Sequence, residues 1–311
     1  MSSVLDNINR YLNSLIPVLA PLGVVLGFAF PDIFINLRPF VILLFGIMTF
    51  SGALKLTAVE LKESMRSPLP ILLFFFTSHV LMPLAAISSS SLLFDNGDII
   101  TGFVLLFAGP TAVSGFIWIT INKGDKALGL TLILLNTLFA PLIVPVTLLI
   151  LIGEKITMDM SGIAISLLFM VVIPTIMGVA LNEVSRGKIP QVLCPGLDPF
   201  AKVCLFLVIA ANSSVVAPNI HFDDPLVWRT ALLCISLTVL GFLLAKLNGI
   251  AGRLNKEKCI SLIFAGGLRN FSAILTIAVT FFPEAAAIPT LLCIVFQQTL
   301  AAVMGKTIIR R

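Results

Sequence analysis

Long apolar runs fill most of the 311-residue chain, and short segments rich in charge, proline or glycine separate them. A helix needs about 20 predominantly apolar residues to cross the hydrocarbon core of a bilayer. The runs that approach this length are 13–30, 39–56, 69–92, 99–121, 127–152, 160–181, 199–217, 228–247, 259–282 and 285–304. The pattern therefore predicts an all-α polytopic membrane protein with ten transmembrane helices and no separate soluble domain. We interpret the first run as a retained helix.

The composition agrees with a membrane protein, since 58% of the residues are apolar and only 11% are charged. An average soluble domain carries about 25% charged residues. With ten crossings, one face of the membrane carries Arg10, Lys55, Lys62, Arg66, Lys123, Lys126, Arg186, Lys188, Lys246, Arg253, Lys256, Lys258, Lys306, Arg310 and Arg311, and the other carries Arg38, Lys155 and Arg229. The positive-inside rule then predicts that both termini are cytoplasmic. The expected localisation is that of a multi-pass protein of the cell inner membrane. The net charge of +5 reflects this distribution and not nucleic-acid binding.

Two interrupted spans suggest an internal repeat. The fourth span contains Gly109-Pro110, and the ninth span contains Gly266-Gly267. Asn136-Thr137 in the fifth span likewise matches Gln298-Thr299 in the tenth. The number of residues that separates the two members is similar for both matches. Each half then has five crossings, so the two halves must lie in the membrane in opposite orientations. The predicted inverted repeats are 1–153 and 154–311, which together form one membrane domain.

The interruptions also indicate where a binding site would lie. Proline removes a backbone donor and glycine weakens a helix, and non-helical backbone at membrane depth survives only where it is buried in protein or lines a cavity. We therefore predict that the fourth and ninth helices are discontinuous and that their breaks mark a binding site near the middle of the membrane. The candidate substrate-binding residues around these breaks are Thr111, Ser114, Arg269 and Asn270.

Each of these residues also has a purely structural interpretation. The hydroxyls could bond their own backbone, and the Arg269 side chain could extend along its helix to the membrane surface. An arginine at the centre of a span costs about 2.5–3.5 kcal/mol on insertion scales, which favours a function for Arg269.

Other polar residues lie near the predicted middle of the membrane. Asn136, Thr137, Gln297 and Gln298 occupy matching places in the two halves, and they either line the substrate cavity or bond a neighbouring helix. His79 in the third span is ionisable near neutral pH. It is either a substrate-binding residue or a buried neutral imidazole that bonds a backbone carbonyl.

Five segments carry a family pattern: MTFSGALKLTAVELKESMRSP (48–68), GPTAVSGFIWITINKGDKALGLTL (109–132), LNTLFAPLIVPVTLLIL (135–151), GGLRN (266–270) and FQQTLAAVMGK (296–306). In these segments, and over nearly its whole length, the chain resembles the bile acid:sodium symporter family. The resemblance implies ten helices in two inverted five-helix repeats, arranged as a core domain and a panel domain. It also implies that the fourth and ninth helices unwind where they cross at the middle of the membrane. It further implies a secondary transporter of organic anions such as bile acids or smaller carboxylates, usually with sodium.

The chain departs from the family where sodium is bound. The resemblance places the family's sodium ligands on Ala265 in place of a glutamate, on Arg269 and Ser78 in place of glutamines, and on Gly129 and Ile133 in place of a serine and a threonine. Ser114 matches one further ligand. We therefore predict no metal site and no cofactor. If sodium binds, which only the resemblance implies, Ser78 and Ser114 are the candidate ligands.

The sequence thus predicts a secondary transporter that moves a small organic anion by alternating access without sodium coupling, either by facilitated diffusion or with a proton. A monomer is the working expectation. The alternatives are a sodium-coupled symporter with other ligands and a non-transporting receptor on the same scaffold. An enzyme is not expected, because no paired carboxylates or metal cluster accompany His79. We further hypothesise that Arg269 replaces the charge of sodium and donates hydrogen bonds to carbonyls freed near Gly109 and Pro110.

Overall fold

The computed structural model describes residues 19–57, 68–153, 159–221 and 223–307. Over these residues the chain is helical, and its one strand-like feature is an isolated antiparallel bridge between Thr111 and Arg269. The predicted all-α class is therefore confirmed for this part of the chain. Both predicted cytoplasmic termini and the start of the first predicted span fall outside the described residues. So does the link between the predicted repeats at 154–158.

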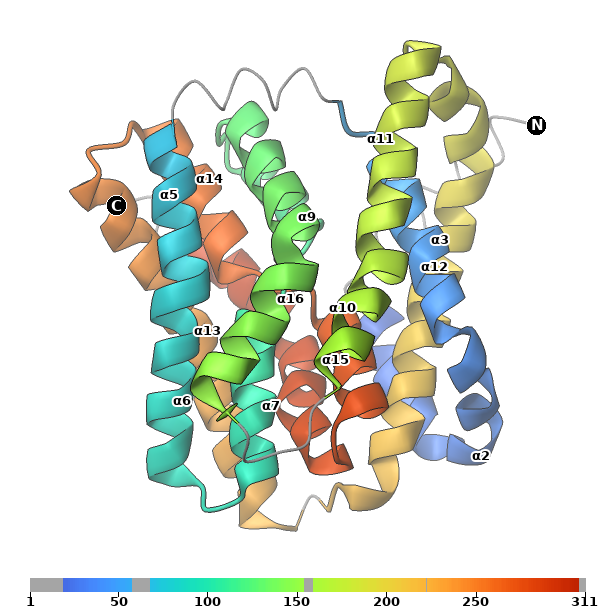
Figure 1. Cartoon of the computed structure of the whole chain (residues 1–311), viewed down its shortest axis with the longest axis vertical. Coiled ribbons are helices and arrows are strands. Elements are labelled where there is room, and N and C mark those ends of the chain that lie inside the picture. Colours follow the sequence, from blue (N-terminus) through green and yellow to red (C-terminus); the bar gives the residue numbers. More distant parts are fainter. Residues whose placement is uncertain (1–18, 58–67, 154–158, 222, 308–311) are drawn as a thin grey trace. The chain divides into compact units, whose positions relative to one another are not determined.

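The chain divides into two compact units (Figure 1). Unit 1 comprises Met1–Ala58 and Ile165–Asn219, and unit 2 comprises Val59–Ala164 and Ile220–Arg311. Each unit therefore combines a segment from each half of the sequence.

Unit 1 is a set of long helices around α3. Its elements are the helix Leu19–Ala29, α2 (Pro31–Phe34), η1 (Ile35–Phe40), α3 (Val41–Ala53), the end of α10 (Met160–Leu167), the π-helical turn η4 (Leu168–Val172), α11 (Ile173–Ser185), α12 (Lys188–Val216) and η5 (Ala217–Asn219). Helix α3 packs against both α11 and α12. The turn between α11 and α12 uses two left-handed residues, Arg186 (φ 51°) and Gly187 (φ 79°). Glycine adopts this conformation without steric cost.

Helix α12 corrects one expectation from the sequence. The predicted span begins at residue 199 and leaves Asp198 outside it, but the helix begins at Lys188 and buries Asp198. Two residues at the end of α3 and just after it satisfy the carboxylate: Ser51 Oγ donates to Oδ1 at 2.9 Å, and Lys55 Nζ donates to Oδ2 at 2.6 Å. A buried carboxylate is tolerated when it is paired and hydrogen-bonded.

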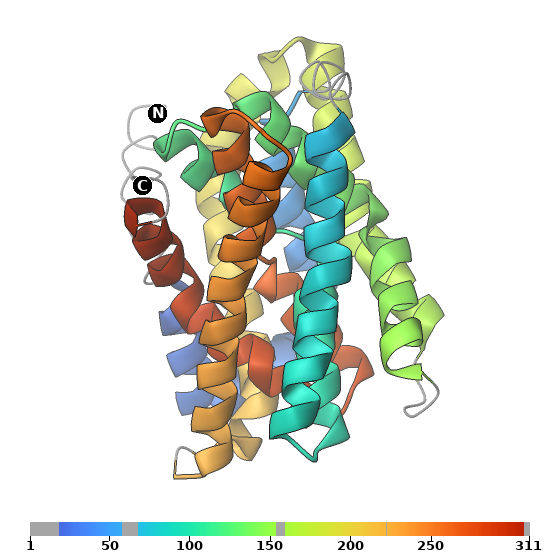
Figure 2. The same ribbon diagram turned by 90° about the vertical axis from the view of Figure 1, so that its left-hand side faces the viewer.

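Unit 2 contains the interrupted helices. Its elements are α5 (Pro68–Phe76), the π-helical turn η2 (Thr77–Leu81), α6 (Met82–Leu93), α7 (Gly97–Ala108), α8 (Gly115–Ile121), α9 (Lys126–Leu151), the start of α10, α13 (Pro225–Ala251), α14 (Lys256–Gly267), α15 (Phe271–Phe281), η6 (Glu284–Ala287) and α16 (Ile288–Thr307). Helix α13 packs against α5 and α6, beside which it lies in Figure 2, and also against α14 and α16.

Short polar side chains fix where several helices of unit 2 begin. Asn96 accepts hydrogen bonds from the backbone of Asp98 and Ile99 at the start of α7. Asp125, Asp224 and Asn255 cap α9, α13 and α14 in the same way. These side chains satisfy N–H groups that have no partner within their own helix.

Seven helices in the described residues are long and apolar enough to cross a membrane, and three shorter apolar helices accompany them. The predicted spans 99–121 and 259–282 each correspond to two helices, since α7 and α8 are separate, as are α14 and α15. The chain is thus a multi-pass membrane protein, as its composition indicates.

A first prediction concerns the contact between α7 and η6. A Cβ atom at Gly102 would overlap the backbone carbonyl of Ala286, whereas a Cβ atom at Gly97 would meet no atom within 4 Å. Overpacking against backbone costs about 1–3 kcal/mol or more. We expect Gly102→Val to lower the melting temperature of the purified protein clearly, and Gly97→Ala to leave it nearly unchanged. Equal melting temperatures for Gly102→Val and the wild type would show that the two segments are not closely packed.

Candidate functional site

The two interruptions in unit 2 meet each other. Thr111, between α7 and α8, forms the antiparallel bridge with Arg269, between α14 and α15. The backbone N–H of Ala112 donates to the Leu268 carbonyl at 3.2 Å, and that of Asn270 donates to the Pro110 carbonyl at 2.8 Å. Backbone groups that the breaks remove from helical hydrogen bonding thus pair with one another, as a buried segment requires.

The sequence at each break allows this close approach. Helix α7 ends at Ala108, where the Gly109-Pro110 pair turns the chain into an extended conformation. Gly109 lies against the Ile274 side chain, and Gly267 at the end of α14 lies against the ring of Phe242. A larger residue at either glycine would push these neighbours away from the crossing.

Thr111 is the central residue of the crossing and is almost fully buried. Its hydroxyl lies 2.5 Å from the Ala265 carbonyl and 2.8 Å from the Leu268 carbonyl, so it donates to the end of the opposite helix. Its backbone N–H donates to Asn136 Oδ1 in α9 at 2.8 Å.

Asn136 connects the crossing to His79. Because Asn136 Oδ1 accepts from Thr111, its Nδ2 is the donor to His79 Nε2, at 2.5 Å. The imidazole is then neutral with its proton on Nδ1, which is buried and has no partner among the described residues. His79 lies in the π-helical turn η2, a distortion that frequently occurs at functional sites. Of the two alternatives for His79, the one with a backbone carbonyl partner is therefore wrong, since the partner is a side chain.

Arg269 is 1% exposed, although it carries a permanent charge. Its Nη1 donates to the Gly109 carbonyl at 3.3 Å, its Nη2 donates to the Ser78 carbonyl at 3.2 Å, and its backbone N–H donates to Gln297 Oε1 at 2.9 Å. The predicted hydrogen bond to the break at Gly109 is confirmed. The alternative in which the side chain extends to the surface is wrong, because the guanidinium is enclosed at the crossing.

We call Thr111, Asn136, His79, Arg269 and Gln297 the crossing network, since hydrogen bonds place all five at the meeting of the two breaks. The side chains of the other predicted residues lie outside it. Asn270 donates its backbone N–H to Pro110 at the crossing, but its side chain caps α15 by accepting from the Ala273 N–H at 3.3 Å. Gln298 accepts from Trp118 Nε1 at 3.0 Å. Thr137 is buried in α9, and Ser114 is half-buried before α8.

The residues present do not fit a sodium ion at the family position. Ala265 packs in an apolar cluster with Phe74, Leu128, Leu132 and Leu262. Gly129 lies against Ile119, and Ile133 is buried. The Ser78 and Gly109 carbonyls already accept from the guanidinium, so a cation held by either of them would share its ligand with a like charge, which repels it. Over the described ranges, no group of three or more His, Cys, Asp or Glu side chains is arranged to hold a metal ion.

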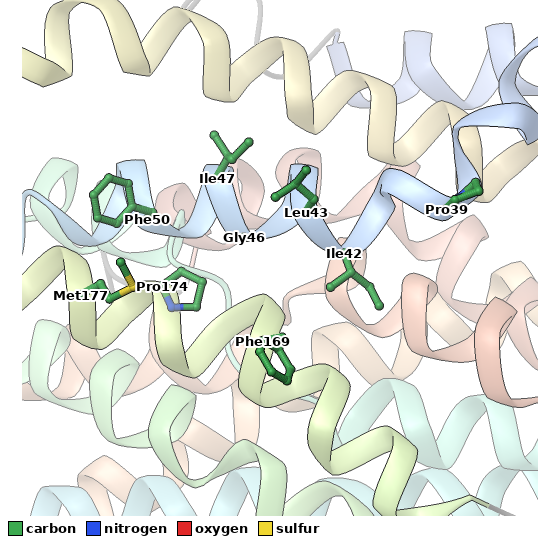
Figure 3. A pocket seen from close by; sticks show the side chains of 9 residues that line it. All are labelled: Pro39, Ile42, Leu43, Gly46, Ile47, Phe50, Phe169, Pro174 and Met177. Carbon is green, nitrogen blue, oxygen red and sulfur yellow. The ribbon is translucent and has the colours of Figure 1, made fainter.

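A separate apolar groove lies in unit 1 (Figure 3). It has a volume of about 500 Å³ and lies between α3 and the helix formed by η4 and α11. Ile42 and Leu43 line one side and Phe169 and Met177 line the other. With no charged side chain in its lining, this groove does not offer a site for the charge of an anion.

Comparison with known proteins decides the family. Residues 41–221 match the model of the sodium bile acid symporter family. The chain belongs to this family. It is 37% identical to the uncharacterised Bacillus subtilis (strain 168) protein YbaS, over 93% of this chain and 95% of that protein.

Two further family relatives are described as transporters. One is the uncharacterised sodium-dependent transporter YocS of Bacillus subtilis (strain 168), 25% identical over 86% of this chain and 82% of that protein. The other is the probable sodium/metabolite cotransporter BASS2, chloroplastic, of Oryza sativa subsp. japonica, 24% identical over 78% of this chain and 58% of that protein. Membership of this family therefore identifies the chain as a membrane transporter and not an enzyme.

Proposed function

We propose that the protein is a secondary transporter that moves a small organic anion, bile-acid-like or a smaller carboxylate, across the cell inner membrane by alternating access. The observation that carries this proposal is the buried guanidinium of Arg269 at the junction of two broken helices, bonded to carbonyls and to no carboxylate among the described residues. An anion bound nearby would offset the cost of burying that charge.

The proposed architecture has ten spans in two inverted repeats, 1–153 and 154–311, with unit 2 as the core domain and unit 1 as the panel domain. Its support is that the breaks at Gly109-Pro110 and Gly266-Gly267 occur in corresponding helices of the two halves. Midplane breaks in corresponding helices are typical of transporters with inverted repeats, and they mark the binding site.

The proposed substrate site is the crossing network with the neighbouring Ser114, Thr137, Asn270 and Gln298. The Arg269 guanidinium has five N–H donors, and the contacts to Gly109 and Ser78 use two of them. The remaining donors suit a carboxylate, which accepts two parallel hydrogen bonds from a guanidinium. The unpartnered Nδ1–H of His79 is a further donor, and the α15 N-terminus adds a favourable dipole.

The test is uptake into proteoliposomes that contain the purified full-length protein. A panel of radiolabelled carboxylates from acetate-sized acids to bile acids should yield at least one substrate with saturable uptake. Neutral amides of the same size should neither enter nor compete, because they cannot pair with the guanidinium. Transport of the amide as fast as of the acid would contradict an anion site at Arg269.

Two relatives carry sodium in their names, and a sodium-coupled symporter with other ligands is the second candidate. A non-transporting receptor is the third. Saturable flux in the same assay would exclude the receptor, and exchange of sodium for potassium would separate the two transport modes.

The proposed orientation is tested by labelling. Both termini are proposed to be cytoplasmic, so the loop before α7 should face outside and the start of α14 inside. We expect a membrane-impermeant thiol reagent on intact cells to label Asp95→Cys and not Lys256→Cys, with the native cysteines replaced by alanine. Asp95 is preferred to Asn96 because Asn96 caps α7. The opposite labelling pattern would invert the proposed topology.

A further inference from the structure

The carbonyl groups at the crossing already have internal donors. The Gly109 carbonyl, at the end of α7, accepts from Arg269, and the Pro110 carbonyl accepts from the Asn270 N–H. On the opposite side of the crossing, the Ala265 carbonyl accepts from the Thr111 hydroxyl, and the Leu268 carbonyl accepts from the Ala112 N–H. In transporters with broken helices, it is such unwound carbonyls and helix ends that coordinate the coupling cation. Here the chain satisfies them with its own donors.

The guanidinium also supplies the charge that a bound cation would supply. It is buried, and its two carbonyl contacts come from different elements, the break after α7 and the π-helical turn η2. A dissociable cation at this place would have to displace these contacts and accept a like charge nearby. The apolar surroundings of Ala265 provide no carboxylate that would favour it.

We infer that Arg269 is a permanent internal replacement for the coupling cation, so that the protein moves its substrate without a coupling ion. This inference rests on the proposed function. A covalently attached cation returns with the protein in every cycle and is never released on the other side. The charge moved per cycle is then the substrate's own negative charge.

This charge balance sets the driving force. Without a coupling ion, the anion distributes according to its own gradient and the membrane potential, and a potential that is negative inside favours its exit. A sodium symporter would instead accumulate the anion against that potential. The protein would therefore act as an electrogenic uniporter whose preferred direction in a cell is export.

The first experiment needs no substrate. The melting temperature of the purified full-length protein is measured in sodium chloride and in potassium chloride at equal ionic strength. We expect the wild type to differ by less than about 1 °C between the two salts. The double variant Ala265→Glu/Arg269→Gln removes the guanidinium and adds a carboxylate, and we expect sodium to raise its melting temperature by about 2 °C or more.

The matched control is Ala265→Glu alone. It adds the same carboxylate but keeps the guanidinium, so its melting temperature should not respond to sodium. Sodium-specific stabilisation of the wild type would overturn the inference. So would a double variant that elutes as a folded protein on gel filtration and still does not respond to sodium.

The second experiment measures the flux of the carboxylate found in the uptake panel. The membrane potential of the proteoliposomes is set by a potassium gradient in the presence of valinomycin. A monoanion should accumulate about tenfold for each ~59 mV of inside-positive potential. Neither a sodium gradient nor a pH gradient should add to this. Accumulation driven by either gradient at zero potential would overturn the inference. If no carboxylate in the panel enters, the proposed function fails, and the melting experiment still decides whether Arg269 replaces a cation.

Discussion

Replacement of Arg269 by glutamine should reduce anion uptake by about 100-fold or more while the protein still folds and inserts. Glutamine removes the buried charge and at least one of the two hydrogen bonds to the Gly109 and Ser78 carbonyls. Hydrogen bonds of charged groups are each worth about 1.5–3 kcal/mol, and 1.4 kcal/mol corresponds to a factor of ten in rate. Arg269→Lys should retain more activity, because it keeps the charge but loses the planar pair of donors.

The measurement is initial uptake into proteoliposomes, normalised to folded protein by gel filtration. Arg229→Gln is the matched control, since Arg229 lies on the exposed surface of α13, and its uptake should equal that of the wild type. Wild-type uptake by Arg269→Gln would show that the guanidinium serves neither the substrate nor the crossing.

The breaks in the helices could be predicted because their causes are local. Pro110 has no backbone N–H, and Gly109, Gly266 and Gly267 are weak helix formers, so the ends of α7 and α14 follow from the residues themselves. Arg269 could be singled out because a charge inside an apolar run needs partners. Because the breaks of the two halves correspond, the carbonyls freed near Gly109 and Pro110 could be proposed as its acceptors.

The partners of His79 and Arg269 outside the breaks could not be predicted in the same way. Asn136 lies 57 residues from His79, and the Ser78 carbonyl that accepts from Arg269 lies 191 residues from it. No periodicity encodes such pairs. The π-helical turn at Thr77–Leu81 was not predicted either; a local signal for it is Pro83, which follows the turn at the start of α6 and has no backbone N–H.

The burial of Asp198 could not be predicted for a related reason. The predicted span begins at residue 199, but α12 begins at Lys188, contains both Pro195 and Pro199, and continues through Asp198. Proline is tolerated in a membrane helix when neighbouring groups satisfy the freed carbonyls. The lysine that neutralises Asp198 follows α3, 143 residues away, so only tertiary structure identifies the pair.

The second large effect is expected at Asn136. Asn136→Leu has a similar volume but leaves two buried groups without partners, the Thr111 N–H and His79 Nε2. Each unsatisfied buried group costs about 1–3 kcal/mol, so the melting temperature should fall by roughly 5 °C or more, and uptake should be lost. Ser90→Ala is the control for stability, because the Ser90 hydroxyl bonds only to carbonyls of its own helix.

Asn136→Asp separates stability from transport. A carboxylate accepts from the Thr111 N–H as the amide does, and it accepts from His79 when the imidazole proton moves from Nδ1 to Nε2. Both hydrogen bonds therefore survive, and the melting temperature should stay nearer to the wild type than that of Asn136→Leu.

The new negative charge lies beside Thr111, the bridge partner of Arg269, where it competes with an anionic substrate. Uptake should fall at least tenfold through a raised KM. A wild-type KM for Asn136→Asp would show that the anion does not bind at the crossing, even if the network holds the two broken helices together.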